Sequence, residues 1–364
     1  MRNSRKWPGA CCFLSLAFLF ANFSSTIVAA ELRPLNFSLH TGISGQKVYV
    51  ASTLKDWDPL AFQMSEVSPG QYRIQMKHPW LHELQYKFVV DGQWQLDPSN
   101  PRKVPDQLGG FNSLLTMTEF KEDPLLDLQP GVSPPEMQIL RIEDWAGRSR
   151  EITIVEPARL HSVQNRNPVL IYFQDGTEYL EKASAANILA NLSERDGLPR
   201  LIGVFVPPRD RIDEYSLTAT TELYVDFFIH SMIPKVEKAL ALSPTAQERV
   251  LIGDSLGGLI SLYLALRSPH LFQLVGSQSG AFLKANKVLK LLGSYQSPAL
   301  RISLDIGIYE NDRFLDGNER VSQLLNLKGW KYRYARHPAV HDWISWRNEL
   351  PTIIRYLLTD ANGE

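Results

Sequence analysis

The chain has 364 residues, of which 44% are hydrophobic and 21% charged, and its formal net charge at pH 7 is −1. This length can hold two globular domains, and the composition is typical of folded rather than disordered protein. A net charge so close to zero argues against a nucleic-acid-binding protein, which needs a strongly basic surface.

The first thirty residues have the pattern of a secretory signal peptide. Three basic residues within the first six precede an apolar run at 10–23, and Val28-Ala29-Ala30 supplies small residues after it. We therefore expect residues 1–30 to be removed and the protein to be exported, to the periplasm or the medium. The apolar run is too short to predict a membrane span and no comparable run follows, so no membrane association is expected after cleavage.

Both cysteines of the chain, Cys11 and Cys12, lie inside this segment. Cleavage after Ala30 would leave a mature protein without thiols. Such a protein needs neither disulfides nor a cysteine nucleophile in an oxidising compartment.

Residues 31–120 predict a small β-sandwich of the immunoglobulin-like type. Short runs rich in apolar and β-branched residues are separated by turn-forming pairs such as Pro69-Gly70 and Asp91-Gly92. The runs lie at 47–51, 71–76 and 84–90.

Within this segment, four motifs are K-D-W-D-P at 55–59, Y-K-F-V-V-D-G-Q-W at 86–94, D-P at 97–98 and L-G-G-F-N-S at 108–113. Together they resemble the glycogen-binding modules that accompany starch-branching enzymes and the β subunit of AMP-activated kinase. The resemblance implies an α-glucan site, in which indoles stack on sugar faces and polar side chains bind hydroxyls. The residues it implies are Trp57, Lys87, Trp94, Leu108 and Asn112. Two alternatives stay open: a rigid appendage, or a domain that shapes the substrate site, as in siderophore esterases.

Residues 121–136 are predicted to be a linker, because they contain four prolines and no helical or strand periodicity. The second domain then covers 137–364. Its apolar strand-like runs alternate with helical patterns, which predicts an α/β domain with a mainly parallel sheet covered by helices on both faces. The runs lie at 138–142, 150–155, 169–173, 201–206, 274–277 and 301–306.

A strand-like run at 249–252 leads into Gly253-Asp254-Ser255-Leu256-Gly257 and a helical pattern at 259–266. This G-x-S-x-G arrangement is typical of a sharp strand-to-helix turn that exposes a nucleophilic serine, here Ser255. The glycines leave room for the incoming strand and the outgoing helix.

The same turn predicts an oxyanion hole. The first backbone N–H of the following helix, that of Leu256, would face an oxyanion formed on the substrate. A second donor is expected from another strand-to-loop junction, where the run at 169–173 leads through Asp175-Gly176 to the N–H of Thr177.

A nucleophilic serine needs a base and an orienting acid. His341 follows a strand-like run at 331–335 and precedes a helix predicted at 350–358, which matches the chain order serine, acid, histidine; His337 is the alternative. Glu310 lies three residues beyond Gly307 at a strand end and is the preferred acid, with Asp312 as alternative.

No pair of histidines has a third ligand at the spacing of a zinc site, and the serine mechanism needs no organic cofactor. We therefore expect neither a metal nor another cofactor.

The second domain contains a further set of motifs, at 175–176, 211–215, 227–234, 253–258, 277–280, 341–343 and 346–347. In combination they resemble the enterochelin esterase-like branch of the esterase D superfamily, which implies an α/β-hydrolase fold and an acyl-enzyme mechanism. A glycine pair usually precedes the histidine in that group, whereas this chain has Ala339-Val340. Arg211 is expected to form an ion pair with a nearby acid or to hold an anionic or catecholate group.

The leading functional prediction is an exported serine ester hydrolase, similar to the siderophore esterases that cleave the lactone backbone of ferric catecholate chelators. One alternative is a carbohydrate esterase that removes acetyl or feruloyl groups from a polysaccharide held by the first domain. Another is a glycan-binding protein with an inactive hydrolase domain. In each case the partner is a small-molecule or glycan ligand and not a nucleic acid.

Overall fold

The structure is a computed structural model, and it describes residues 32–55, 57–79, 83–106, 109–116, 121–157, 167–242, 248–284, 286–295 and 300–359. The predicted signal peptide, 1–30, lies outside these residues. A search of the described ranges finds no helix with the length and apolar character needed to cross a lipid bilayer.

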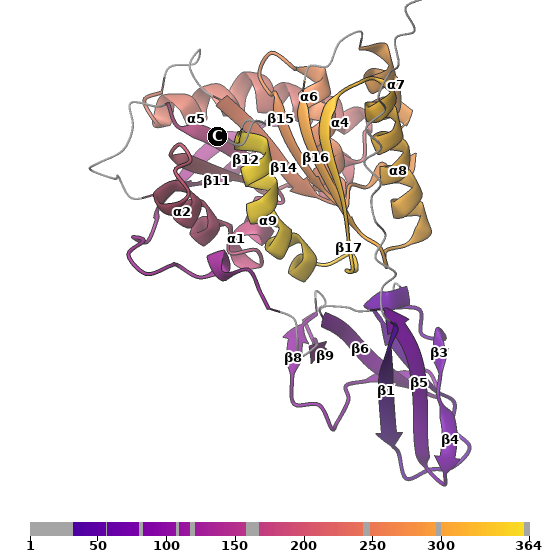
Figure 1. Cartoon of the computed structure of the whole chain (residues 1–364). Helices are drawn as coiled ribbons and strands as arrows, with labels where there is room; N and C mark the ends of the chain where they lie inside the picture. Colours follow the sequence, from indigo (N-terminus) through magenta and orange to yellow (C-terminus); the bar gives the residue numbers. More distant parts are fainter. Residues whose placement is uncertain are drawn as a thin grey trace, which may run out of the picture.

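The amino-terminal part of the chain consists of two antiparallel sheets (Figure 1). One has the strand order β1-β5-β4, and the other has the order β3-β2-β6-β9-β8 with β7 paired to β6. The elements are β1 (Leu32–His40), β2 (Val48–Ser52), the 3₁₀ turn η1 (Thr53–Lys55), β3 (Phe62–Gln63), β4 (Ser65–Ser68), β5 (Gln71–Pro79), β6 (Glu83–Val90), β7 (Gln93–Gln95), β8 (Lys103–Pro105) and β9 (Phe111–Thr116).

Alternate side chains of these strands point into one hydrophobic cluster, which we call the sandwich core. On β6, Tyr86 and Phe88 are buried while Lys87 between them is not, as the two-residue period of a strand requires. Phe37 of β1 packs edge-on against Tyr86, with ring centroids 4.9 Å apart. The predicted β-rich amino-terminal domain is confirmed.

The carboxy-terminal part is built on an eight-stranded sheet of order β10-β11-β13-β12-β14-β15-β16-β17. All neighbouring strands from β13 to β17 are parallel, whereas β10 and β11 join antiparallel at one edge. The strands are β10 (Glu136–Glu143), β11 (Ser149–Glu156), β12 (Val169–Gln174), β13 (Leu201–Val206), β14 (Glu248–Asp254), β15 (Leu274–Gln278), β16 (Arg301–Gly307) and β17 (Lys331–His337).

Helices cover both faces of this sheet (Figure 1). They are α1 (Gly176–Glu181), α2 (Ala185–Arg195), α3 (Arg211–Tyr215), α4 (Ala219–Phe227), the π-helical turn η3 (Phe228–Met232), α5 (Ile233–Ala239), α6 (Leu256–Arg267), the 3₁₀ turn η4 (Phe282–Lys284), α7 (Asn286–Ser294), α8 (Asp312–Leu327) and α9 (Trp343–Leu358). Strand β12 shows why both faces are covered, since its side chains alternate between two hydrophobic clusters. Leu170 and Tyr172 pack in the cluster under α3 to α8, and Ile171 and Phe173 pack in the cluster under α1, α2 and α9.

The segment predicted as a linker is packed against the second domain. Its 3₁₀ turn η2 (Pro124–Leu126) buries Leu125 and Leu126 in the cluster under α2 and α9. Asn191 of α2 donates hydrogen bonds to the carbonyl oxygens of Leu125 and Asp127, both over 2.9 Å. These contacts hold the proline-rich segment against the surface of the sheet domain.

The last helix starts earlier than the sequence predicted. Helix α9 begins at Trp343, not near Leu350, because the Asp342 side chain accepts a hydrogen bond from the Ser345 N–H and caps the helix. Pro351 suggests a helix start when only the sequence is read, but here it lies inside the helix.

Candidate active site

Ser255 occupies the turn between β14 and α6, at the carboxyl end of a central strand. Its backbone has φ +51° and ψ −116°, a conformation that non-glycine residues rarely adopt. A Cβ placed on Gly253 would lie 2.3 Å from the backbone of Gly257, so the turn can form only with glycine at that position. The predicted strained turn is therefore present.

The two predicted oxyanion donors lie at the ends of adjacent strands. Strands β12 and β14 are parallel neighbours, so the turns that follow them meet at one edge of the sheet. Leu256 and Thr177 occupy the first turns of α6 and α1, where an N–H has no acceptor four residues earlier in its own helix. Asp175, the N-cap residue of α1, has the left-handed backbone conformation, with φ +58°.

Arg211 of α3 is held by acids beside this turn. Its Nε and Nη2 donate to the two carboxylate oxygens of Asp175, each over 2.8 Å. Its Nη2 also lies 3.5 Å from Asp254 Oδ2. Burial, reinforced by the Asp175 charge, raises the pKa of Asp254 well above its usual range. The ion pair that the sequence left as one of two roles for Arg211 is present.

His341 and Glu310 are paired on the loops that follow β17 and β16. His341 Nδ1 lies 2.7 Å from Glu310 Oε2. The other carboxylate oxygen, Oε1, accepts the Gly307 N–H over 2.9 Å and the Ser279 hydroxyl over 2.5 Å. Since Glu310 is only 6% exposed, these donors replace the water that a buried carboxylate loses.

The two acids that the sequence left open differ in position. Glu310 contacts the imidazole, whereas Asp312 is the exposed first residue of α8. The His341 ring also packs against Phe314 and Trp346, with centroid distances of 4.5 and 4.9 Å. The imidazole is thereby held by one hydrogen bond and two ring contacts.

Two residues of this group, Ser279 and Trp346, have no role predicted from the sequence. Trp346 Nε1 donates to Ser279 Oγ over 2.9 Å, and Ser279 donates in turn to Glu310. Both belong to motifs that carry the family resemblance. Ser279 is part of S-Q-S-G at 277–280, and Trp346 is part of W-R at 346–347. That was the available signal, but Ser279 lies 31 residues from Glu310 and 67 residues from Trp346 in the chain.

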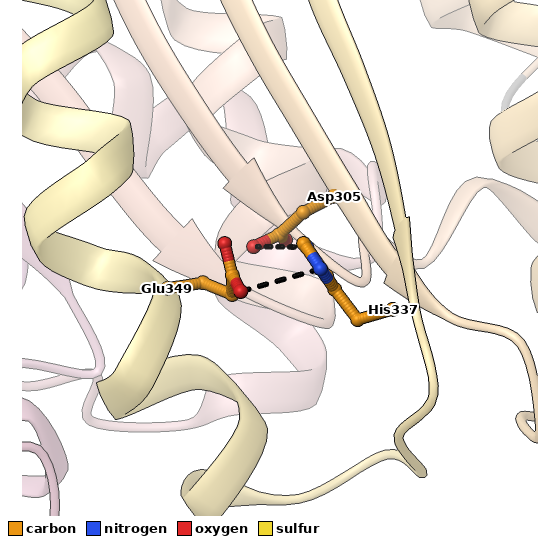
Figure 2. A group of neighbouring side chains, drawn as sticks. All are labelled: Asp305, His337 and Glu349. Carbon is orange, nitrogen blue, oxygen red and sulfur yellow. Dashed lines mark ion pairs between the residues drawn. The ribbon is translucent and has the colours of Figure 1, made fainter. Parts of the chain in front are cut away.

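The alternative histidine, His337, lies in a different group of side chains. Its Nδ1 is 3.2 Å from Glu349 Oε1 and its Nε2 is 4.0 Å from Asp305 Oδ2. Figure 2 shows the ring between the two carboxylates. Of the two histidines, His341 is the one whose ring contacts the predicted acid, Glu310.

One imidazole and two carboxylates form a donor set that binds divalent metals in other proteins, and these donors lie within 4.8 Å of one another. However, the two ring nitrogens of His337 face different carboxylates, so one ion could not use both contacts. Arg333 Nη2 also lies 3.5 Å from Glu349 Oε2 and supplies positive charge. The contacts present are those of a partly buried network of two acids, a histidine and an arginine.

Four of the five predicted sugar-site residues are described; Leu108 lies outside the described residues. Trp57 is half-buried and Trp94 is 46% exposed, with ring centroids 6.5 Å apart and an interplanar angle of 45°. Lys87 Nζ donates to Asp106 Oδ2 over 2.8 Å. Asn112 is 6% exposed and its amide donates to the side chain of Gln85 over 2.9 Å.

Strand register places these residues on one face. Lys87 and Val89 share the face of β6 opposite to the sandwich core, and Val89 pairs with Trp94 of β7. Tyr86 pairs with Ser113 of β9, so Asn112 lies across from Lys87. The structure thus gathers Lys87, Trp94 and Asn112 on a common face, with Trp57 beside Trp94.

Both parts of the chain match family models. Residues 145–357, more than half of the chain, match the family described as "Putative esterase". Residues 34–123 match the family described as the glycogen recognition site of AMP-activated protein kinase.

Individual proteins show the same division. The iron(III) enterobactin esterase of Escherichia coli O6:H1 is 24% identical over 295 residues, which cover 78% of this chain and 70% of that protein. The AMP-activated protein kinase subunit beta-1 of Sus scrofa is 36% identical over 87 residues, which cover 24% of this chain and 66% of that protein. The crystal structure of ferric enterobactin esterase from Salmonella typhimurium superposes with a TM-score of 0.70 and 20% identity, covering 90% of this chain and 94% of that one.

The buried Asp305 carboxyl predicts how stability depends on pH. Burial, with the neighbouring Glu349 charge, raises the pKa of Asp305 from 3.8 to about 8. The folded protein therefore binds a proton at this site that the unfolded chain releases. This contribution to the free energy of unfolding is complete below pH 4 and is lost as the pH rises toward 8, by at most about 1.4 kcal/mol per pH unit.

Thermal melts of the wild type and of Asp305→Asn between pH 4.5 and 8.5 measure this contribution. The variant cannot ionise, so its melting temperature should fall less over that range. Asp312→Asn, at an exposed acid, is the matched control and should follow the wild type. Parallel curves for Asp305→Asn and the wild type would contradict the raised pKa.

Proposed function

The chain belongs to the esterase family matched by residues 145–357, and on that premise we propose that it is a serine ester hydrolase in which Ser255, His341 and Glu310 form the catalytic triad. The observation that carries this proposal is the 2.7 Å contact between His341 Nδ1 and the buried Glu310 carboxylate. Such a contact selects the tautomer that leaves Nε2 as the proton acceptor and stabilises the imidazolium that forms.

In the proposed reaction, His341 takes the proton of Ser255 as its Oγ attacks the ester carbonyl. The N–H groups of Leu256 and Thr177 bind the oxyanion of the tetrahedral intermediate, and the alcohol leaves with the proton from His341. Water, deprotonated by the same histidine, then attacks the acyl-enzyme, and the acid leaves as His341 returns the proton to Ser255 Oγ. No step requires a metal or an organic cofactor.

We propose an α/β-hydrolase fold for 137–364, a linker at 121–136 and an immunoglobulin-like β-sandwich for 31–120. The parallel strands from β13 to β17 support the first assignment, and the two facing antiparallel sheets support the last. The basic and apolar pattern of 1–30 supports export of the mature protein.

For the substrate we propose the ester bonds of a siderophore lactone. The support is the similarity to an iron(III) enterobactin esterase across both parts of the chain, 78% of its length.

A second candidate is a carbohydrate esterase whose first domain holds the glycan. The match of 34–123 to a glycogen recognition site and the paired indoles of Trp57 and Trp94 favour it. Indoles at a surface bind sugar rings by stacking. In this case the Lys87 and Asn112 side chains, now bonded to Asp106 and Gln85, would exchange those partners for sugar hydroxyls.

The triad assignment predicts different effects at two neighbouring acids. Glu310→Gln should lower kcat for a p-nitrophenyl ester by up to about four orders of magnitude, because the amide favours the wrong tautomer and cannot stabilise the imidazolium. Asp312→Asn is the matched control and should retain the wild-type kcat. Ser255→Ala defines the background rate. A loss confined to Asp312→Asn would move the acid to that residue, and wild-type turnover by Ser255→Ala would remove the nucleophile assignment.

The substrate assignment is tested by competition. The purified mature protein is offered a ferric catecholate lactone and acetylated or feruloylated oligosaccharides, and kcat/KM is measured for each. We expect the lactone to be preferred. Comparable values would leave the lactone assignment unsupported, and a preference for the oligosaccharides would favour the carbohydrate esterase.

The sugar face is tested by the double change Trp57→Ala with Trp94→Ala. Since Trp94 is 46% exposed and Trp57 is half-buried, the variant should keep its melting temperature and lose the heat of maltoheptaose binding in isothermal titration. If the two indoles formed part of a core, their truncation would instead cost about 3–5 kcal/mol of stability. No heat from the folded wild type at millimolar ligand would reduce the first domain to an architectural or substrate-shaping role.

A further inference from the structure

The loops that carry the acid and the histidine are bonded to each other. The Ile308 N–H donates to the His337 carbonyl over 2.8 Å, and the Tyr309 N–H donates to the Ala339 carbonyl over 3.1 Å. A Cβ on Gly307 would lie 2.3 Å from the Ala339 oxygen, so the two backbones are in direct contact. A displacement of one loop must therefore displace the other.

Both loops also send a side chain into the amino-terminal domain. Val340 is 2% exposed and is a member of the sandwich core, together with Leu84, Tyr86 and Phe88 of β6. Tyr309 packs against the same core. Figure 1 shows the end of β17 next to the β-rich domain.

These contacts fall immediately beside the paired side chains. Val340 directly precedes His341, and Tyr309 directly precedes Glu310. In a close-packed core a side chain has essentially one position, so burial of Val340 and Tyr309 restrains the backbone from which the imidazole and the carboxylate project. Without the sandwich core, both residues would lie on a solvent-exposed loop.

Charged side chains that influence one another lie at the same boundary. Glu83 is the first residue of β6, and burial raises its pKa while the positive charge of Arg347 in α9 opposes that rise. The negative charge of Glu83 also acts on Asp342, the cap of α9. The start of β6 therefore faces the segment that contains His341.

We propose that Val340 and Tyr309 are positioning residues through which the sandwich core holds the Glu310–His341 pair in its productive geometry. The amino-terminal domain is then a structural component of the active site, independently of any glycan it binds. This inference rests on the proposed function for the roles of Glu310 and His341, but the contact itself can be measured without turnover.

The test uses the full mature protein with Val340→Ala, Val340→Ile and Leu39→Ala. Leu39 is the matched control because it belongs to the same core, but pairs with Tyr72 at the end of β1 remote from the start of β6. Two readouts are taken on each folded variant: kcat and KM for a p-nitrophenyl ester, and the low-field proton signal of the His341 Nδ1–H hydrogen bond in NMR, assigned by its loss in Glu310→Gln.

We expect Val340→Ala to lower kcat by about ten- to a hundred-fold with little change in KM, since small misplacements of a catalytic group have effects of this size. It should also shift or broaden the low-field signal. Val340→Ile and Leu39→Ala should keep both readouts.

Wild-type kcat and an unchanged signal in Val340→Ala would overturn the proposal. So would equal losses in Leu39→Ala, which would reduce the effect to general destabilisation. If Ser255→Ala retained turnover, the proposed function would fail, but the low-field signal would still decide whether Val340 positions His341.

Discussion

The hydrogen bond between Glu310 and His341 depends on a buried carboxylate kept in place by donors from three other parts of the chain. A carboxylate removed from water is stable only when hydrogen bonds replace its hydration. Here Gly307, Ser279 and His341 together provide them, and Trp346 holds the serine. Each donor belongs to a different strand or to the loop after it. The geometry of the Glu310–His341 pair therefore depends on how the carboxyl ends of these strands pack together.

That edge exists because the central strands are parallel. Their carboxyl ends all point the same way, so the turns after β12, β14, β15, β16 and β17 meet at one end of the sheet. Two hydrophobic clusters bury both faces and make the strand ends rigid. The strained backbone of Ser255 is tolerated because the strand before it and the helix after it are both part of these clusters.

Strand β6 links the two parts of the molecule. One of its faces contributes Tyr86 and Phe88 to the sandwich core, which also contains Val340 beside His341. The opposite face carries Lys87 and Val89, and Val89 pairs with Trp94 of β7. Strand β6 therefore lies between the face that resembles a glycogen site and the core that contains Val340. This arrangement places the amino-terminal domain next to the loop that carries His341.

The sequence alone determined the features that are local. The strand, turn and helix around Ser255 and the alternating strands of the amino-terminal domain follow from short-range periodicity and glycine placement, and the motifs predicted the families that the chain matches. Short-range patterns did not predict the start of α9 at Trp343. Pro351 suggests a later helix start, whereas the structure has Asp342 as the cap. Nor does any short-range pattern indicate that Leu125 and Leu126 of the proline-rich segment are buried against α2 and α9.

Only the tertiary structure paired Glu310 with His341, exposed Asp312, and gave Ser279, Trp346 and Val340 their contacts. The two acids are two residues apart in similar sequence surroundings, and only the packed loop buries one while α8 exposes the other. The partners of Ser279 lie 31 and 67 residues away. Such contacts are set by how the elements pack, and no periodicity within a short stretch of chain records them.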